Sequence, residues 1–151
     1  MPLDVRWPLL ALGATLLLAG CGGSGDPGRS GPGQAQVRFL VQLYHGNLEG
    51  AYATLHPAYQ RIVTRKRFVA CTRKTPLGTL DSIDVLKVYD DPIEIPGAGR
   101  VPAKAVRVRL TSSDGGATTF VNHEVEVGSR WRWVLNAAAA NAYEAGRCPG
   151  G

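Results

Sequence analysis

The chain of 151 residues has few of the patterns that mark a catalytic or cofactor site. It contains no glycine loop of the phosphate-binding form, no nucleophile elbow and no cluster of side chains at metal-ligand spacing. Its three cysteines are too few and too far apart for a closed zinc site. We therefore expect no metal and no cofactor, and an enzyme would have to work through isolated acid–base side chains.

A hydrophobic run long enough to span a membrane is also missing. Residues 7–19 are nearly all apolar, but a spanning helix needs about 20 such residues. Because Arg6 precedes the run and small residues follow it, residues 1–20 are typical of a secretory signal. One interpretation is an ordinary cleaved secretory peptide that is followed by a cysteine, Cys21, by chance.

The four residues Leu18-Ala19-Gly20-Cys21 resemble the lipobox of bacterial lipoproteins. The resemblance implies that the peptide is cut before Cys21, that diacylglycerol is attached to its thiol, and that the new N-terminus is usually acylated too. Such a protein would be extracytoplasmic and lipid-anchored to a bacterial membrane. The mature chain keeps the net charge of +5, because the leader removes one cation and one anion.

Residues 21–33 after the leader consist almost wholly of glycine, proline and serine, so we expect a flexible tether. The remaining residues, 34–151, suit one small domain. Cys71 and Cys148 are the two cysteines left in it, and in an oxidising compartment we expect them to form a disulfide. The alternatives are two free thiols, or a catalytic Cys71 activated by neighbouring cations.

The first half of the domain shows helical patterning. From Gln34 on, apolar residues recur at the spacing of one helical face, and Gly46 should end that helix. A second helical piece is expected over 48–55, and Pro57 suits the first turn of a third. Thr64 is a suitable N-cap for a fourth short helix.

Beyond Pro76 the hydrophobic period changes to two, which is typical of strands. Strands are expected over 83–89, 106–110, 121–127 and 131–135, a loop or frayed edge strand over 92–102, and an alanine-rich helix over 137–145. The dipeptides within Asp114-Gly115-Gly116 favour a two-residue hairpin turn. That turn would place the valines of both strands on one face and Arg107 opposite Asn122 or Glu124.

Four stretches carry a resemblance to a known fold: Val37–Leu40, Gly50–Tyr59, Arg67-Phe68 and Arg130–Val134. Their order resembles the nuclear transport factor 2-like superfamily, the cone shared with ketosteroid isomerase and limonene epoxide hydrolase. The resemblance implies an α+β fold with N-terminal helices packed on a curled antiparallel sheet of about four strands, plus a short C-terminal helix. A cystatin-like sheet wrapped on one helix is the alternative.

His123 is the one titratable residue on the apolar face of an expected strand, so we expect it to point into the core or a cavity. Enzymes of the superfamily place an acid or base in the mouth of the cone. The resemblance therefore makes His123 a candidate catalytic residue, with a structural buried histidine as the alternative. Glu124 and Glu126 are expected on the polar face, where neighbouring arginines can neutralise them.

The densest basic cluster comprises Arg61, Arg65, Lys66, Arg67, Arg73 and Lys74. Cations at a helix N-terminus are unfavourable by about 0.3 to 1 kcal/mol each, so this cluster is either a solvated face or an anion-facing patch. An anionic lipid surface or wall polymer would be its ligand. Nucleic acid is not expected, because no aromatic side chains are interleaved for stacking.

Two functional hypotheses follow. The first is a non-catalytic lipoprotein domain that binds a small apolar ligand or an envelope protein. The second is a small-molecule isomerase or hydrolase that works through His123. A deep apolar cavity containing His123 and a second titratable group would favour the enzyme, whereas a cone filled by aromatic side chains would favour binding.

Overall fold

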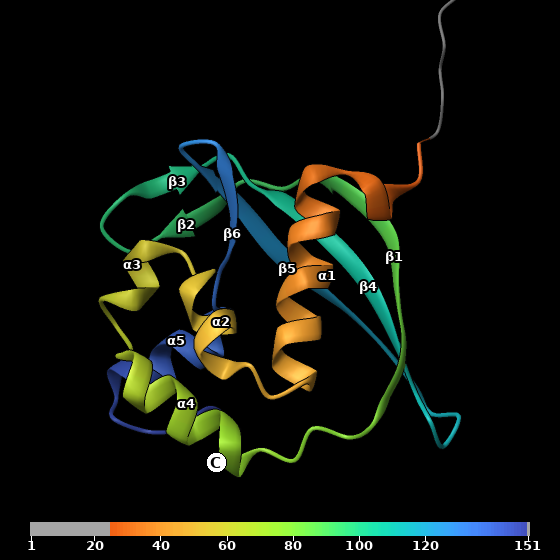
Figure 1. Cartoon of the computed structure of the whole chain (residues 1–151). Coiled ribbons are helices and arrows are strands. Elements are labelled where there is room, and N and C mark those ends of the chain that lie inside the picture. The colour runs from red at the N-terminus through yellow and green to blue at the C-terminus, as the bar shows by residue number, and fades with distance from the viewer. Residues whose placement is uncertain (1–24, 151) are drawn as a thin grey trace, which may run out of the picture.

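A computed structural model of the chain describes residues 25–150, and the leader and Cys21 lie outside the described residues. Its elements are η1 (Pro27–Arg29), α1 (Gly31–Tyr44), α2 (Leu48–Ala53), α3 (Pro57–Gln60), α4 (Arg65–Lys74), β1 (Leu80–Asp90), β2 (Ile93–Ile95), β3 (Gly99–Val101), β4 (Lys104–Ser112), β5 (Ala117–Val127), β6 (Arg130–Trp133) and α5 (Ala137–Glu144). No helix among these residues is long and apolar enough to cross a membrane. Helix α1 lies across a twisted sheet and contacts β1, β4, β5 and β6 (Figure 1).

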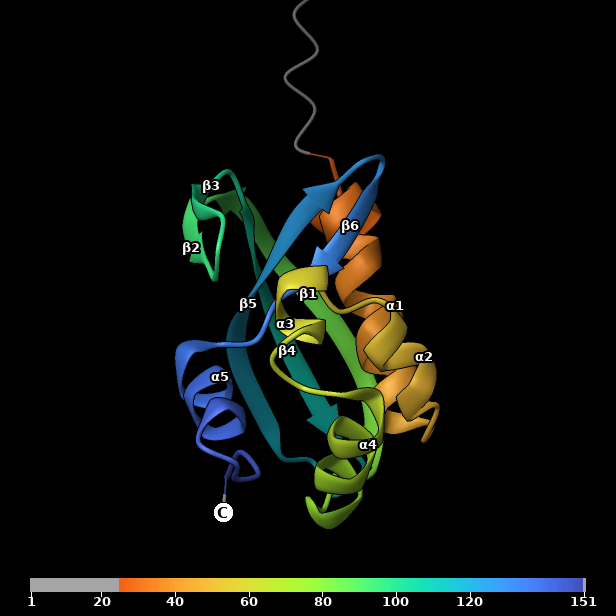
Figure 2. The same ribbon diagram turned by 90° about the vertical axis from the view of Figure 1, so that its left-hand side faces the viewer.

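The sheet has the order β1-β4-β5-β6 with antiparallel neighbours, and a separate hairpin is formed by β2 and β3. Figure 2 shows that the strands curl and that α1 and α2 lie along one side while α5 and the β2–β3 hairpin lie on the other. The predicted α+β architecture of helices packed on a curled four-stranded sheet, with a short C-terminal helix, is confirmed. The segment 92–102, expected as a loop or a frayed edge strand, contains this hairpin.

Helix starts follow the sequence closely. Thr64 Oγ1 accepts a hydrogen bond from Arg67 N, and Asn136 Oδ1 accepts one from Ala139 N, so both residues cap the helices that they precede. His56 does the same for α3, because its Nδ1 accepts a hydrogen bond from Ala58 N at 3.1 Å. This contact explains how a histidine stands where serine or aspartate is the usual cap.

The predicted tether is wrong for its last residues. Asp26 caps a 3-10 turn that begins at Pro27, and Ser30 Oγ accepts from Gly33 N to open α1. A β-carbon at Gly31 would lie 2.6 Å from Trp131 Nε1, and one at Gly33 would lie 2.2 Å from Pro27 O. Gly31 and Gly33 are therefore required by close packing, although the glycine-rich composition of residues 21–33 had indicated a flexible tether.

The predicted register of the β4–β5 hairpin is wrong by one residue. Arg107 stands opposite Val121, and Val106 stands opposite Asn122. Ser112 N donates to Gly116 O across a three-residue loop in which Gly115 has φ of 84°. A slip of one residue exchanges the two faces of a strand, so Asn122 and Glu124 face the helices, while Val121 and His123 face away from them.

The core between helices and sheet centres on Trp133. Its ring stacks on Phe39 at a centroid distance of 4.1 Å and lies 5.9 Å from Phe68, and its Nε1 donates to Ala51 O at 2.9 Å. The buried indole ring is therefore packed against other aromatic rings, and its N–H has a hydrogen-bond acceptor. The base of the cone is filled by these aromatic side chains.

The predicted disulfide is present. Cys71 of α4 is bonded to Cys148, which follows α5, and their Cα atoms are 5.4 Å apart. The bond joins two elements separated by 77 positions in the chain. It therefore fixes α5 against the helical layer.

Candidate functional site

An open pocket of about 760 Å³ lies between the β2–β3 hairpin, β5 and α5. Its apolar lining includes Ile93, Ile95, Val121, Val134, Leu135 and Ala140. Figure 2 shows these elements around one side of the molecule. A concave, mainly apolar surface with a few polar groups is typical of a ligand-binding site.

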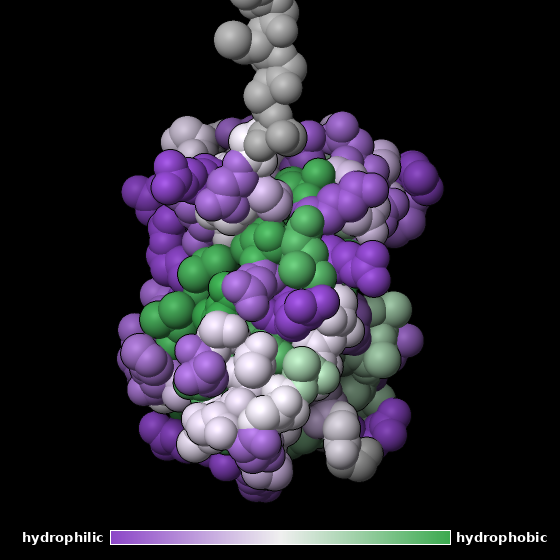
Figure 3. All heavy atoms as spheres, turned by 90° about the vertical axis from the view of Figure 1, so that its right-hand side faces the viewer, coloured by the Kyte–Doolittle hydropathy of each residue, from purple (hydrophilic) through white to green (hydrophobic). Residues whose placement is uncertain are grey.

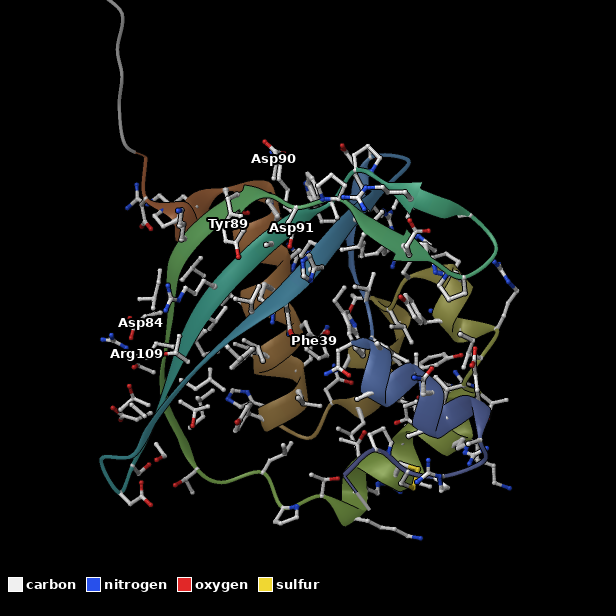
Figure 4. The ribbon with its side chains drawn as sticks, turned by 180° about the vertical axis from the view of Figure 1, so that it is seen from behind. Phe39, Asp84, Tyr89, Asp90, Asp91 and Arg109 are labelled. Atoms are coloured by element: carbon white, nitrogen blue, oxygen red, sulfur yellow. A yellow bond between two sulfur atoms is a disulfide. The ribbon has the colours of Figure 1, made fainter. Side chains whose placement is uncertain are left out.

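His123 lies in the lining of this pocket and bonds to Asp91, with His123 Nε2 2.7 Å from Asp91 Oδ2. Asp91 follows β1, beside Asp90 (Figure 4), and its backbone N donates to Ala103 O. Asp90 has a partner of its own, Lys104 Nζ at 2.7 Å, so Asp91 remains available for the imidazole. The histidine side chain is 25% exposed.

Of the two expected positions, core or cavity, His123 takes the second, and it does so on the face of the sheet away from α1, because the hairpin loop has three residues. Its pairing with a carboxylate does fit one criterion for catalysis, since a carboxylate orients an imidazole for proton transfer. However, Tyr59 is the one hydroxyl-bearing side chain in the described lining, and no serine, threonine or cysteine lines it. A covalent mechanism would therefore have to use the phenol of Tyr59, the imidazole of His123 or the carboxylate of Glu94 or Glu144 as its nucleophile.

The charges of the pocket are of one sign. Glu94 and Glu144 line it, and no lysine or arginine does so among the residues that the structure describes. This contrasts with the net charge of +5 of the whole chain. No group of three or more histidine, cysteine, aspartate or glutamate side chains that could hold a metal ion occurs in residues 25–150.

The concave side of the sheet holds a smaller pocket of about 330 Å³. It is lined mainly by apolar side chains, among them Phe39, Leu43, Phe120 and Leu135, with Asn122 as a polar group. Among the aromatic side chains near the sheet, Trp133 is in the core, Tyr44 lines this pocket and Trp131 lies against Gly31. The cone mouth is thus largely occupied by the protein's own side chains.

Glu124 is the titratable residue that the sequence analysis placed wrongly. It is 1% exposed, stands opposite Trp133, and has no hydrogen-bond partner for either carboxyl oxygen among the described residues. Burial raises the pKa of this carboxyl to about 8, against a smaller lowering by the charge of Arg38. Gln36 of α1 is likewise fully buried without a described partner.

The basic cluster lies on α4 and the turn before it, at the end of the molecule opposite to the point where the chain leaves toward residue 24 (Figure 1). Arg61, Arg65, Lys66, Arg73 and Lys74 are exposed, and Arg67 is half-buried. No described ion pair involves any of them. Arg73 and Lys74 occupy the last turn of α4, where the helix dipole favours cations, whereas the first-turn cations oppose it.

A separate apolar area lies on the side of the molecule that carries β1 (Figure 3). Leu86 and Tyr89 of β1 are 40% and 38% exposed. Gly28 of η1 approaches Val85 of the same strand, since a β-carbon on Gly28 would lie 3.8 Å from Val85 Cβ. The 3-10 turn therefore covers part of this strand, and a register shift between Val85 and Lys87 interrupts its ladder.

No protein-family model and no curated protein matches this chain. A solved structure described as an NTF2-like transpeptidase from Campylobacter jejuni matches with a TM-score of 0.51 and 13% sequence identity. The match covers 71% of this chain and 100% of that one. At such an identity the likeness concerns the fold and not the activity. Together with the observed topology, it shows that this chain has a nuclear transport factor 2-like fold.

Proposed function

We propose that the protein is an extracytoplasmic lipoprotein, anchored through acylated Cys21, whose domain binds a ligand or an envelope protein without catalysis. The observation that carries the binding role is the open pocket beside β5, which is mainly apolar, acidic at its charged positions and without serine, threonine or cysteine in its described lining. The Cys71–Cys148 disulfide supports an oxidising compartment. The Leu-Ala-Gly-Cys sequence supports the anchor.

The anchor would hold a particular end of the domain near the membrane. Three residues lie between Cys21 and Gly25, so the Cα atoms of Cys21 and Gly25 are at most about 14 Å apart. The α1 helix of 14 residues extends about 21 Å away from the end where it begins. Because α4 lies near the other end of α1 (Figure 1), its cations would stand beyond the Debye length of about 8 Å from an anionic surface. This favours an anionic wall polymer over lipid head groups as the ligand of the basic cluster.

A proton-transfer enzyme is the second candidate, and one observation favours it. The His123–Asp91 pair at 2.7 Å lines the pocket, as an acid–base catalyst would. His123→Gln separates the two candidates: this variant would abolish turnover in an enzyme, whereas binding would be changed modestly. Turnover by the parent that is lost in His123→Gln would favour the enzyme, and retained binding alone would not, because an inactive enzyme variant also binds. We expect no turnover that depends on His123.

The binding role is tested by filling the pocket. Asn141 lines it from an exposed position on α5, so Asn141→Trp should place an indole there with little effect on folding. Ala138→Trp is the matched control, because Ala138 is exposed on the same helix and is not part of the lining. In native membranes, chemical crosslinking should yield a defined adduct with the parent and with Ala138→Trp but not with Asn141→Trp. Equal adducts from both variants would contradict the proposal.

A further inference from the structure

The pocket lies against the edge of a strand. Val121, Asn122 and His123 all line it, although consecutive side chains of a strand point to opposite faces. Three successive residues can meet one pocket only if their main chain borders it. The floor of the pocket therefore includes the backbone of β5.

This backbone edge has no strand partner upstream of Glu124. β6 pairs with β5 from Glu124 to Val127, and the last hydrogen bond of the ladder runs from Val134 N to His123 O at 3.2 Å. The chain then leaves the sheet and enters α5. Because alternate residues direct their N–H and C=O groups to the same side, Val121 and Thr119 direct theirs to this open edge.

No strand among residues 25–150 fills that position, and Thr119 and Val121 are both exposed. An unpaired edge is a template for another extended chain, and proteins usually protect such an edge by covering or interrupting it. The edge of β1 is protected in this way by η1 and by its register shift. The edge of β5 has neither protection.

We propose that the open edge of β5 accepts an extended basic peptide of a partner protein as an additional strand, held by main-chain hydrogen bonds to Thr119 and Val121. The inference rests on the proposed binding role of the pocket and names its ligand class. Alternate side chains of the peptide would enter the apolar part of the pocket beside Leu135 and Ala140. Lysine or arginine side chains would meet Glu94 and Glu144.

Charge decides between this occupant and a second copy of the chain. The free segment of β5 has the sequence Ala-Thr-Thr-Phe-Val-Asn and carries no cation. If two copies of the chain paired along this edge, the added strand would bring no lysine or arginine to Glu94 and Glu144. The negative charges of both glutamates would then have no partner on that strand. A basic peptide would pair with the edge and bring cations to Glu94 and Glu144. Arg107 and Arg109, which stand opposite Val121 and Thr119 on β4, would lie two strand spacings, about 10 Å, from such a peptide.

The test uses the full chain in a nonionic detergent and the acetylated, amidated peptide Val-Lys-Val-Lys-Val-Thr as the probe, with binding measured by fluorescence anisotropy. We expect saturable binding and slower hydrogen exchange at the amides of Thr119 and Val121. The same peptide with alternate amides N-methylated should bind at least tenfold more weakly, and so should Val-Glu-Val-Glu-Val-Thr. No saturable binding of the lysine peptide, or binding that N-methylation leaves unchanged, would overturn the proposal.

Two variants locate the complex. Val121→Pro removes only an outward-facing amide, which an edge strand tolerates, whereas the control Val121→Ala keeps it. We expect the proline variant to bind the peptide at least tenfold more weakly than the alanine variant, with equal thermal melting. Glu94→Gln combined with Glu144→Gln should weaken binding severalfold and remove its salt dependence. Equal binding of the peptide by all variants would show that it does not bind at the open edge of β5. If the lysine peptide does not bind but Asn141→Trp still loses the crosslinked adduct, the basic peptide is rejected as the ligand. The binding role of the pocket then remains supported.

Discussion

Glu124 stands directly opposite Trp133 in the β5–β6 ladder, with its carboxyl buried on the helical side of the sheet. Since burial raises the pKa of this carboxyl from 4.5 to about 8, the folded protein holds a proton that the unfolded chain releases. Between about pH 4.5 and pH 8 the unfolded state therefore binds fewer protons, and stability falls as pH rises. Below and above this window Glu124 contributes no pH dependence.

The corresponding prediction concerns Glu124→Gln. The free energy of unfolding of the parent should fall by a few kcal/mol from pH 5 to pH 8, and the glutamine variant should lack most of this fall. Urea denaturation at several pH values measures it. Glu126→Gln is the matched control, because Glu126 is exposed two residues further along the same strand. The same pH slope in the parent and in both variants would show that Glu124 does not hold the proton.

A second prediction concerns the start of α1. In an ordinary helix, replacing glycine by alanine stabilises a protein by about 1 kcal/mol. At Gly33 the new methyl would lie 2.2 Å from the backbone carbonyl of Pro27, so Gly33→Ala should destabilise by about 1 to 3 kcal/mol. Gly78→Ala provides the control, since a β-carbon there would meet nothing within 4 Å. A more stable Gly33→Ala would mean that η1 does not pack as described.

The disulfide supports a third prediction. Closing so long a loop stabilises a fold by about 4 kcal/mol in the chain-entropy description. Reduction of the purified protein should lower its free energy of unfolding by about this amount and loosen α5 first, as hydrogen exchange in α5 would report. The paired substitution Cys71→Ser with Cys148→Ser should behave like the reduced parent and be insensitive to reductant. Labelling of both cysteines by a thiol reagent in the unreduced protein would contradict the bond.

The helical half of the fold could be predicted from the sequence because its determinants are local. Thr64 and Asn136 cap the helices that they precede, and Gly46, with φ of 76°, ends α1 as its position suggested. The cysteine pair was also expected, from the number of cysteines in the domain together with the oxidising compartment that the leader implies. These features depend on residues within one turn or on compartment chemistry, so no knowledge of distant contacts was needed.

The candidate site could not be predicted in the same way. Asp114-Gly115-Gly116 is compatible with loops of different lengths, and one additional loop residue exchanged the environments of His123 and Glu124. The pocket combines the β2–β3 hairpin, β5 and α5, whose distance in space is set by tertiary packing and by the Cys71–Cys148 bond. Gly31 and Gly33 were predicted to belong to a flexible tether, because amino-acid composition does not show that Trp131 and the Pro27 carbonyl pack against them.

The proposed membrane anchoring depends above all on the fate of Cys21. Its most direct test is intact mass spectrometry of the N-terminal peptide from protein isolated in its native membrane, with Cys21→Ala as the control. We predict a mature chain that begins at Cys21 and carries a thioether-linked diacylglycerol, and a Cys21→Ala variant that is unprocessed or released. A native protein that retains its leader, or that begins at residue 21 without acyl chains, would contradict the account.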